Sequence, residues 1–379
     1  MPDLKKQKLS DYTDYVQEKI LVKKLDNNTY ISTENMLPDR GGITKSSGLP
    51  NANYTQCFSE GDILLSNIRP YFKKIWYATF NGGCSNDVLV LRAKSNVCSK
   101  FLYYVLSDDK FFEYDTATSK GTKMPRGDKV AIMKYGVPQY DLPTQEKIAH
   151  VLSSLDDKIE LNNKINQNLE QQADLLFNDL FLEDKDCIKL SEVISTTSGG
   201  TPSRKNLNFY TNGSFCWIKS KELNGTFITE TEEKINQLAI EKSSAKLLPP
   251  YSVLLAMYGA TVGEYAIISK QMTCNQAICA IIPNEKYPYT YIYEYIKLSK
   301  EKIKTLAIGS AQQNISQVLI KDLLVHKNIN KIKEYHFKTR YLFELIKNNQ
   351  IENEKLKQLR DTLLPKLMSG EIDVDKVEI

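Results

Sequence analysis

The sequence of 379 residues lacks the local motifs that mark most enzymes. It contains no GxxxxGK(S/T) loop and no GxGxxG turn, which cradle phosphates, and no HExxH helix, which binds zinc. The (N/D)PP(Y/F) tetrad, by which amino-methyltransferases hold the amino group of a base, is also absent. We therefore expect no catalytic residue and no cofactor bound by this chain.

Metal-binding side chains are scarce as well. The three histidines, His150, His326 and His336, are scattered along the sequence, so we expect no metal site. The seven cysteines are odd in number and include no CxxC pair. We interpret them as reduced thiols.

Long apolar runs are also missing. No run reaches the roughly 18 residues needed to span a bilayer, and the start, Met-Pro-Asp-Leu-Lys-Lys, lacks the apolar region of a signal peptide. With 41% hydrophobic residues, 25% charged residues and a net charge of +4, the composition is that of a globular protein. We expect a soluble, cytoplasmic protein of two to three domains with no membrane partner.

What the sequence does contain is an internal duplication. It matches itself at an offset of 190 residues, about half its length. The segment GDILL at 61–65 corresponds to YSVLL at 251–255, and CSNDV at 84–88 corresponds to CNQAI at 274–278. With a small slip, KLSD at 8–11 corresponds to KLSE at 189–192. A period this long excludes a solenoid, whose units are roughly 20–50 residues.

Each copy has a globular part and a helical part. Short β-type runs broken by Gly, Asn and Pro predict α+β domains, and a long amphipathic stretch follows each of them. We predict globular domains over 1–143 and 187–330, a central helix over 144–186, and a C-terminal helix with a tail over 331–379.

Both helical parts have coiled-coil spacing, in which apolar residues alternate at intervals of three and four. The first seam comprises Ile148, Leu152, Leu155, Ile159, Asn162, Asn166, Leu169, Ala173, Leu176 and Leu180. The second comprises Tyr335, Lys338, Leu342, Leu345, Asn349, Glu352, Leu356, Leu359 and Leu363, with Pro365 and Gly370 ending or bending the helix. The middle of each seam is polar, which either fixes the register of the helices or marks a solvated stretch.

Charge separates the two helices from each other and from the globular domains. Residues 144–186 carry a net charge of −6 and residues 331–371 carry +3, so the remaining residues carry +7. Opposite charges favour an antiparallel pair of helices with internal pseudo-two-fold symmetry. The positive globular domains indicate binding to a polyanion.

Basic and amide-rich stretches within those domains are candidates for DNA binding, although each alone is equally typical of a solvated surface. They contain Gly or Pro, and therefore expose backbone in loops. Amides replace the arginine at the equivalent place in the second copy, as expected of domains that read different bases. The candidates are Arg69, Tyr71, Lys73, Lys74, Lys120, Lys123, Arg126, Lys129, Arg204, Lys205, Lys219, Lys221, Tyr258, Gln312, Gln313 and Asn314.

Eight segments together resemble the specificity subunit of type I restriction-modification systems over nearly the whole chain. They are GDILLSNIRPY at 61–71, GGCSNDV at 82–88, GTKMPRG at 121–127, LPTQEKIA at 142–149 with LDDKIELNN at 155–163, GGTPS at 199–203, AMYGATVG at 256–263 and LPKLMSGEI at 364–372.

The resemblance implies two target recognition domains, each reading half of a split sequence in double-stranded DNA. It implies two helices that set the gap and dock two methyltransferase subunits. S-adenosylmethionine, ATP and Mg²⁺ would belong to partner subunits, and the presence of a restriction subunit stays open. The sequence departs from the family at His326, where the first copy has Pro138, and the LPxQE segment is absent before the second helix.

Two alternatives remain. An enzyme in its own right, a methyltransferase or a nuclease, would bind S-adenosylmethionine as an isolated chain. A coiled-coil scaffold would show absent or salt-insensitive DNA binding.

Overall fold

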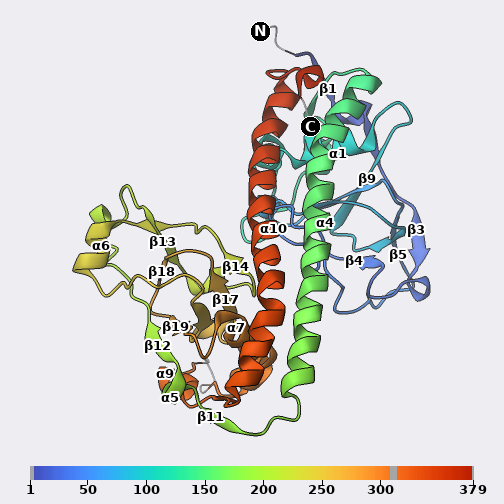
Figure 1. Cartoon of the computed structure of the whole chain (residues 1–379). Helices are drawn as coiled ribbons and strands as arrows, with labels where there is room; N and C mark the ends of the chain where they lie inside the picture. Colours follow the sequence, from blue (N-terminus) through green and yellow to red (C-terminus); the bar gives the residue numbers. More distant parts are fainter. Residues whose placement is uncertain (1–3, 308–313, 378–379) are drawn as a thin grey trace. The chain divides into compact units, whose positions relative to one another are not determined.

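The computed structural model describes residues 4–307 and 314–377, which divide into two compact units (Figure 1). The first unit comprises Met1–Ile159 with Lys355–Ile379, and the second comprises Glu160–Glu354. Because the boundary crosses both long helices, each helix contributes one end to each unit. None of the described helices has the length and apolar character needed to span a bilayer. All seven cysteines are free thiols.

The first unit contains two four-stranded sheets and a two-stranded ribbon. One sheet has the order β2-β9-β6-β7, the other has the order β3-β5-β8-β4, and β1 pairs with β10. The strands are β1 (Lys6–Lys8), β2 (Thr13–Tyr15), β3 (Lys19–Leu21), β4 (Tyr30–Ile31), β5 (Tyr54–Phe58), β6 (Ile63–Ser66), β7 (Ile75–Tyr77), β8 (Gly82–Cys84), β9 (Val88–Ala93) and β10 (Gly136–Pro138).

The first three residues of strand β6 are apolar, and the whole strand is buried on both faces. Ile63 and Leu65 pack into one core with the helices of the unit, whereas Leu64 packs into a second core with Phe58 and Ile31. The helices are α1 (Ser99–Ser107), α2 (Asp109–Thr118) and α3 (Lys129–Ile132), with the 3-10 turns η1 (Leu9–Asp11), η2 (Val22–Lys24), η3 (Pro70–Phe72) and η7 (Val374–Lys376).

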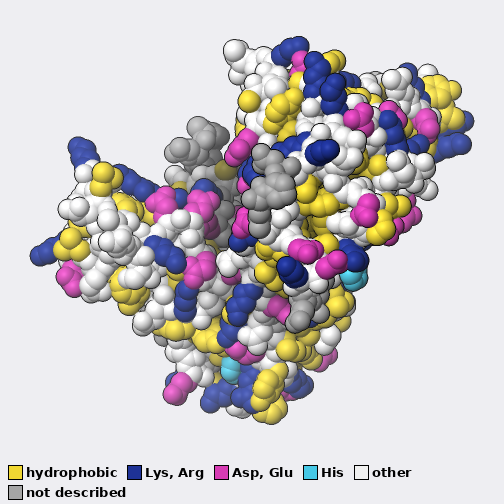
Figure 2. Space-filling view, turned by 90° about the horizontal axis from the view of Figure 1, so that it is seen from above, with side chains coloured by type: hydrophobic (Ala, Val, Ile, Leu, Met, Phe, Trp, Pro, Cys, Tyr) yellow, Lys and Arg dark blue, Asp and Glu magenta, His cyan; other side chains and the backbone are white. Residues whose placement is uncertain are grey.

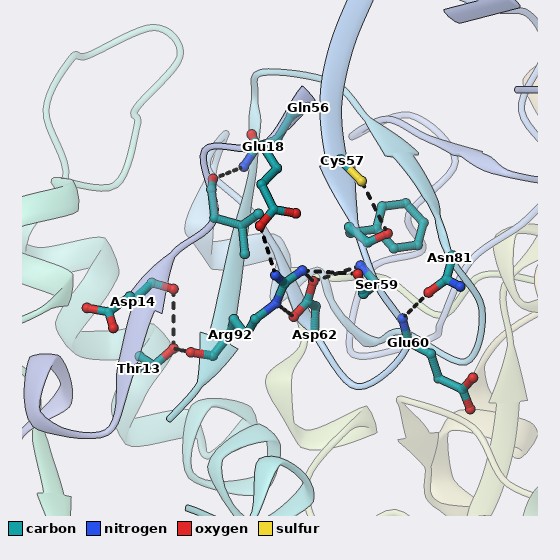
Figure 3. Close-up of polar contacts among 12 residues, drawn as sticks. Thr13, Asp14, Glu18, Gln56, Cys57, Ser59, Glu60, Asp62, Asn81 and Arg92 are labelled. Atoms are coloured by element: carbon teal, nitrogen blue, oxygen red, sulfur yellow. Dashed lines mark hydrogen bonds and ion pairs between the residues drawn. The ribbon is translucent and has the colours of Figure 1, made fainter. Parts of the chain in front are cut away.

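A bidentate ion pair ties the start of β6 to strand β9 (Figure 3). Arg92 donates from Nε and Nη2 to the two carboxylate oxygens of the buried Asp62, at 2.8 Å each. The backbone N–H of Ser59 donates to Asp62 as well, at 2.8 Å, and Glu18 lies 3.3 Å from the guanidinium. The buried carboxylate thus has the partners that its burial requires.

The second unit has a related arrangement, with five strands in one sheet and three in the other. Its sheets have the orders β12-β19-β16-β17-β14 and β15-β13-β18, and β11 pairs with β20. The strands are β11 (Cys187–Lys189), β12 (Ser195–Ser198), β13 (Phe215–Ile218), β14 (Phe227–Ile228), β15 (Lys234–Ile235), β16 (Val253–Ala256), β17 (Tyr265–Ile268), β18 (Thr273–Cys274), β19 (Ile278–Ile282) and β20 (Leu324–His326). The helices and turns are α5 (Leu190–Val193), α6 (Gln237–Lys242), α7 (Tyr289–Leu298), α8 (Lys300–Thr305), α9 (Gln317–Lys321), η4 (Leu207–Phe209), η5 (Ser220–Glu222) and η6 (Gly259–Thr261).

The strand order confirms the internal repeat. The series β2-β9-β6-β7 in the first unit recurs as β12-β19-β16-β17 in the second. The registers agree as well, since Ile63 pairs with Leu91 and Val253 pairs with Ile281, each residue displaced by 190. Helices α1 and α7 begin at the same offset.

The two long helices predicted from the sequence are present as α4 (Leu142–Phe181) and α10 (Ile329–Ser369). They start alike, because Asp141 and Asn328 each accept a hydrogen bond from the N–H three residues later, at 3.1 and 3.2 Å. The departure at His326 therefore leaves the start of the second helix intact. Helix α10 continues through Pro365 and ends before Gly370, whose φ of +73° only glycine adopts easily.

Within each unit the two helices run antiparallel, as predicted. In the first unit Arg360 of α10 pairs with Asp156 of α4 at 2.6 Å. In the second unit Asn162 donates to Glu352 at 2.8 Å and to Asn353 at 2.9 Å, and Asn349 donates to Asn166 at 2.8 Å. The polar seam is therefore a buried ladder of amides with mutual hydrogen bonds, not a solvated stretch.

The predicted seam agrees with the structure in α4 but not in α10. Every predicted seam residue of α4 is buried or half-buried. In α10, Lys338, Leu345 and Leu359 are exposed, the last two by 50% and 47%, so their predicted place in the seam is wrong. Phe343 and Ile346 are buried in the core instead. The buried face is displaced because α10 packs on its globular domain, where Phe343 lies 5.3 Å from the ring of Tyr293.

Candidate nucleic-acid interface

Two of the predicted basic stretches of the first unit meet in one surface. The first is loop 67–74, between β6 and β7, and the second is loop 119–128, between α2 and α3. Backbone hydrogen bonds join them, from Arg69 N–H to the Pro125 carbonyl at 2.8 Å and from Gly127 N–H to the Asn67 carbonyl at 3.1 Å. Lys120 and Arg126 exchange backbone hydrogen bonds at 2.8 and 2.9 Å, which closes the second loop on itself.

Loop 67–74 presents aromatic rings beside basic side chains. Arg69 and Lys73 have left-handed backbones, with φ of 52° and 51°, and flank the turn η3. Tyr71 and Phe72 are exposed by 48% and 38%, and their ring centroids lie 4.8 Å apart. Exposed rings between cations are typical of surfaces on which nucleic acid bases or sugars pack.

The lysines of this loop already have protein partners. Lys73 pairs with Asp109 at 2.8 Å, an acid that also binds Arg40. Lys74 donates to the Thr33 carbonyl at 2.6 Å, and burial lowers its pKa. Of these two lysines, only Lys73 takes part in an ion pair with a described residue, and that pair is partly exposed. Water and salt weaken such a pair.

Loop 119–128 has a mixture of paired and unpaired cations. Lys120 pairs with Asp128 at 2.6 Å, and this contact together with backbone hydrogen bonds lowers the pKa of Asp128. Arg126 pairs with Asp87 at 3.0 Å, not with Asp128, and the pair is half-exposed. Lys123 and Lys129 are exposed and form no ion pair with any described residue. Exposed pairs contribute about 0–1 kcal/mol, so DNA phosphates could replace the carboxylates at small cost.

The second unit places different residues at the same site. An isolated bridge joins Ile68 to Arg126 in the first unit, and the corresponding bridge joins Tyr258 to Asn314 in the second. Tyr258 and Asn314 are exposed. Gln312 and Gln313 lie outside the described residues. An arginine in one domain therefore occupies the position of an asparagine in the other.

The third basic stretch, residues 201–221, is less positive in the fold than in the sequence. The antiparallel pairing of β13 with β15 brings Glu232 and Glu233 beside it. Arg204 and Lys219 pair with Glu233 at 2.6 and 2.5 Å, and Lys221 pairs with Glu232 at 2.8 Å. The hydrogen bond from Arg204 lowers the pKa of Glu233 to about 2. The fold thus places acidic partners beside a stretch that contains no acid of its own, and Lys205 alone of the four cations is exposed without an ion pair among the described residues.

Arg204 is also held by aromatic rings. Its guanidinium lies 4.5 Å from the ring centroid of Tyr210 and 5.0 Å from that of Trp217. Arg40 is a further cation that the sequence analysis missed, because its contact with the loop comes from backbone hydrogen bonds between residues 39–40 and 72–73. No local pattern in the sequence predicts such a long-range contact.

Charges of both signs are mixed on one face of the molecule. On the face drawn in Figure 2, Lys and Arg side chains are interspersed with Asp and Glu. No group of three or more His, Cys, Asp or Glu side chains among the described residues could hold a metal ion.

Comparison with known proteins gives a consistent family. Residues 2–171 and 183–361 each match the type I restriction modification DNA specificity domain. The HindI specificity subunit of Haemophilus influenzae is 26% identical, over 98% of this chain and 100% of its own length. The MjaIX specificity subunit of Methanocaldococcus jannaschii is 26% identical, over 84% of this chain and 79% of its own length.

The S subunit of a type I restriction-modification system from M. genitalium has the same fold. It superposes with a TM-score of 0.61 at 17% identity, over 97% of this chain and 96% of its own. Together with the matches of both halves, this likeness identifies the duplication as two related domains. The chain belongs to the type I restriction modification DNA specificity domain family and carries two copies of that domain.

Proposed function

We propose that this chain is the non-catalytic DNA sequence-specificity subunit of a type I restriction-modification complex. Each globular domain reads one half of a bipartite target in double-stranded DNA. The observation that carries this proposal is the pair of equivalent bridges, Ile68 with Arg126 and Tyr258 with Asn314. One backbone framework holds different base-reading residues in the two domains.

The chemistry of these residues suits two different half-sites. Arginine pairs bidentately with guanine and asparagine pairs bidentately with adenine in the major groove. Exposed lysines nearby, Lys123 and Lys129, would neutralise phosphates without reading sequence. The first domain would thus combine a base-reading position with exposed lysines that approach the DNA backbone.

A domain exchange tests the division of labour. Replacing residues 187–329 with the equivalent segment of a relative should change one half-site only. The measurement is methylome sequencing of cells that carry the chimera and its methyltransferase subunits. The wild-type chain is the control, and a change in both half-sites would contradict the assignment of one half-site to each domain.

The two long helices would set the gap between half-sites. Half-sites read from one face of B-DNA lie about one helical turn, roughly 34 Å, apart. Helix α4 has 40 residues and is therefore about 60 Å long. The buried amide ladder would hold the register of the pair, because a shift of one helix past the other would leave buried amides without partners.

The helices would also dock two methyltransferase subunits. An apolar stripe, defined here as Phe337, Tyr341 and Leu345, is exposed on one face of α10, with one residue per turn. Leu161 and Ile165 form a similar exposed pair on α4. Exposed apolar residues arranged in this way mark protein interaction surfaces.

Substitution of the stripe tests docking. Phe337→Ser combined with Tyr341→Ser should weaken the association with methyltransferase subunits, measured by the mass of the purified complex. Leu207→Ser is the control, since Leu207 is a similarly exposed apolar residue in the second globular domain. Unaltered assembly of the double variant, or equal loss in the control, would contradict the docking role of this stripe.

Catalysis would then belong to other subunits, which would bind S-adenosylmethionine, ATP and Mg²⁺. The chain would act in the cytoplasm, where the DNA is. The alternative, an enzyme in its own right, is tested by equilibrium binding of S-adenosylmethionine. Binding by the isolated chain would favour the alternative, whereas binding only by the assembled complex would favour the proposal.

A further inference from the structure

A buried polar cluster lies beneath the crossing of the two loops in the first unit. Asp115 of α2 is 0% exposed, and neither of its carboxyl oxygens has a hydrogen-bond partner among the described residues. The side-chain oxygen of Asn67 is buried and lacks such a partner too. A Cβ at Gly127 would lie 2.6 Å from Asp115 Oδ1 and 3.0 Å from Asn67 Oδ1. Both oxygens therefore converge on Gly127, the residue that joins loop 119–128 to loop 67–74.

Burial of this carboxyl favours its neutral form. Desolvation raises the pKa of Asp115 to about 7, so the group takes up a proton near neutral pH. A protonated carboxyl is a hydrogen-bond donor, and Asn67 Oδ1 is the neighbouring acceptor without a partner. A proton on Asp115 thus allows a hydrogen bond beneath the loop crossing, which an ionised carboxylate could not donate.

The surrounding titratable groups do not neutralise Asp115. Tyr15 of β2 faces it, donates a hydrogen bond to the Lys129 carbonyl at 3.1 Å, and has a pKa raised by burial and by Asp115. Asp128 at the start of α3 is also negative, and it pairs with Lys120. Arg69, two residues after Asn67, has a buried Nε that lacks a described hydrogen-bond partner.

The second domain shows that the fold does not need these polar groups. There Met257 and Ile315 make the same backbone contacts, because Ile315 N–H donates to the Met257 carbonyl at 2.8 Å, as Gly127 donates to Asn67. Both side chains are buried in the apolar core. At the offset of 188 that relates Gly127 to Ile315, the residue corresponding to Asp115 is Ile303, which is also buried in that core. Apolar filling is the more stable solution, since an unpartnered polar group in a core is destabilising.

We propose that Asp115, acting with Asn67, is a positioning residue that holds loop 119–128 in the conformation in which the first domain reads DNA. Ionisation of Asp115 would remove the hydrogen bond to Asn67 and draw water under the loop. Discrimination at the first half-site should then weaken as the pH rises, while discrimination at the second half-site stays constant. This inference rests on the proposed function, which assigns one half-site to each domain.

The experiment uses the full chain assembled with its methyltransferase subunits. The complex selects sequences from a randomised DNA library at pH 6.0 and at pH 8.5, and the recovered DNA gives the preference at both half-sites. In the wild type we expect preference at the first half-site to fall about tenfold between the two pH values, the effect of losing about one hydrogen bond.

Two variants separate positioning from folding. Asp115→Asn keeps a donor for Asn67 but cannot ionise, so its preference at the first half-site should be the same at both pH values. Asp14→Asn removes an exposed carboxylate of the same domain and should behave as the wild type. Thermal unfolding of each variant is recorded at both pH values.

The second half-site is the internal control. A wild type with no pH dependence at the first half-site would overturn the inference, as would an Asp115→Asn variant that keeps the dependence. Equal changes at both half-sites would also overturn it, because they would indicate a general effect on binding. Failure of the wild-type complex to select any bipartite sequence would overturn the proposed function together with the inference.

Discussion

Glu294 should make the second unit less stable as the pH rises. This glutamate of α7 is 0% exposed, and burial, together with a hydrogen bond to Asp174, raises its pKa to about 9. Tyr335 of α10 lies 3.2 Å from one carboxyl oxygen, and the ammonium of Lys297 lies 3.4 Å from the other while it donates to Asp174. One cation for two carboxyl groups leaves Glu294 protonated at neutral pH.

The sign and magnitude follow from proton linkage. Between pH 4.5 and about 9 the folded unit keeps a proton that the unfolded chain releases, so the free energy of unfolding falls as the pH rises. One proton corresponds to about 1.4 kcal/mol per pH unit, or about 4 kcal/mol between pH 5 and pH 8. Glu294→Gln cannot ionise and keeps the size of the side chain, so its stability should lack this contribution.

Urea unfolding at pH 5, 6, 7 and 8 measures the effect. Trp217 lies in the second unit and Trp76 in the first, so a Trp76→Phe background makes the fluorescence report on the second unit. This matters because Asp115 gives the first unit its own pH dependence. If the free energy of unfolding changes equally with pH in the protein with Glu294 and in the Glu294→Gln variant, the reasoning is refuted.

Three further predictions concern DNA reading and the helices. Arg126→Ala should reduce the free energy of binding to the cognate site by about 1–3 kcal/mol and relax one base position of the first half-site. Lys123→Ala should weaken binding to all sequences and reduce the slope of log affinity against log salt concentration by about one. Competition with DNA that carries single-base changes separates the two effects. Insertion of four residues after Leu169 adds about 6 Å of helix and should lengthen the unspecified spacer between the half-sites by one or two base pairs, measured by methylome sequencing. An unchanged spacer in an active variant would contradict the proposal that the helices set the spacer length. Asn162→Leu should destabilise the helix pair by about 1–3 kcal/mol in urea unfolding, because Asn353 loses its buried partner, and a more stable variant would contradict the ladder.

The repeat and both long helices could be predicted from the sequence because they depend on periodicity. An offset of 190 residues predicts equivalent strands wherever the copies retain their apolar runs, and the registers of β6 with β9 and of β16 with β19 agree with it. The seam of α4 was predicted correctly because the residues that recur at intervals of three and four are buried or half-buried, whereas Leu161, Ile165 and Leu175 fall outside that spacing and are exposed.

The errors arose where contacts join distant segments. Leucine spacing alone placed Leu345 and Leu359 in the seam of α10, whereas packing against α7 selects Phe343 and Ile346. In the same way, Arg126 pairs with Asp87, 39 residues away, through the pairing of two loops. Charge partners set by sheet and loop pairing cannot be found from local spacing, so the acids that face the basic stretches could not be predicted.

Different polar side chains join each domain to the long helices. This difference restricts which domains can be exchanged. In the first unit Tyr104 of α1 donates to Asp156 of α4 at 2.7 Å, and Arg360 of α10 pairs with the same carboxylate. In the second unit the residue at the equivalent position is Glu294, and its partner is Tyr335. A domain grafted between residues 187 and 329 leaves Asp174 and Tyr335 behind in the helices, so it must bring a neutral or protonated hydrogen-bonding residue to position 294. A graft that brings an apolar residue there would leave buried polar groups without partners, and it would fail through docking and not through DNA reading.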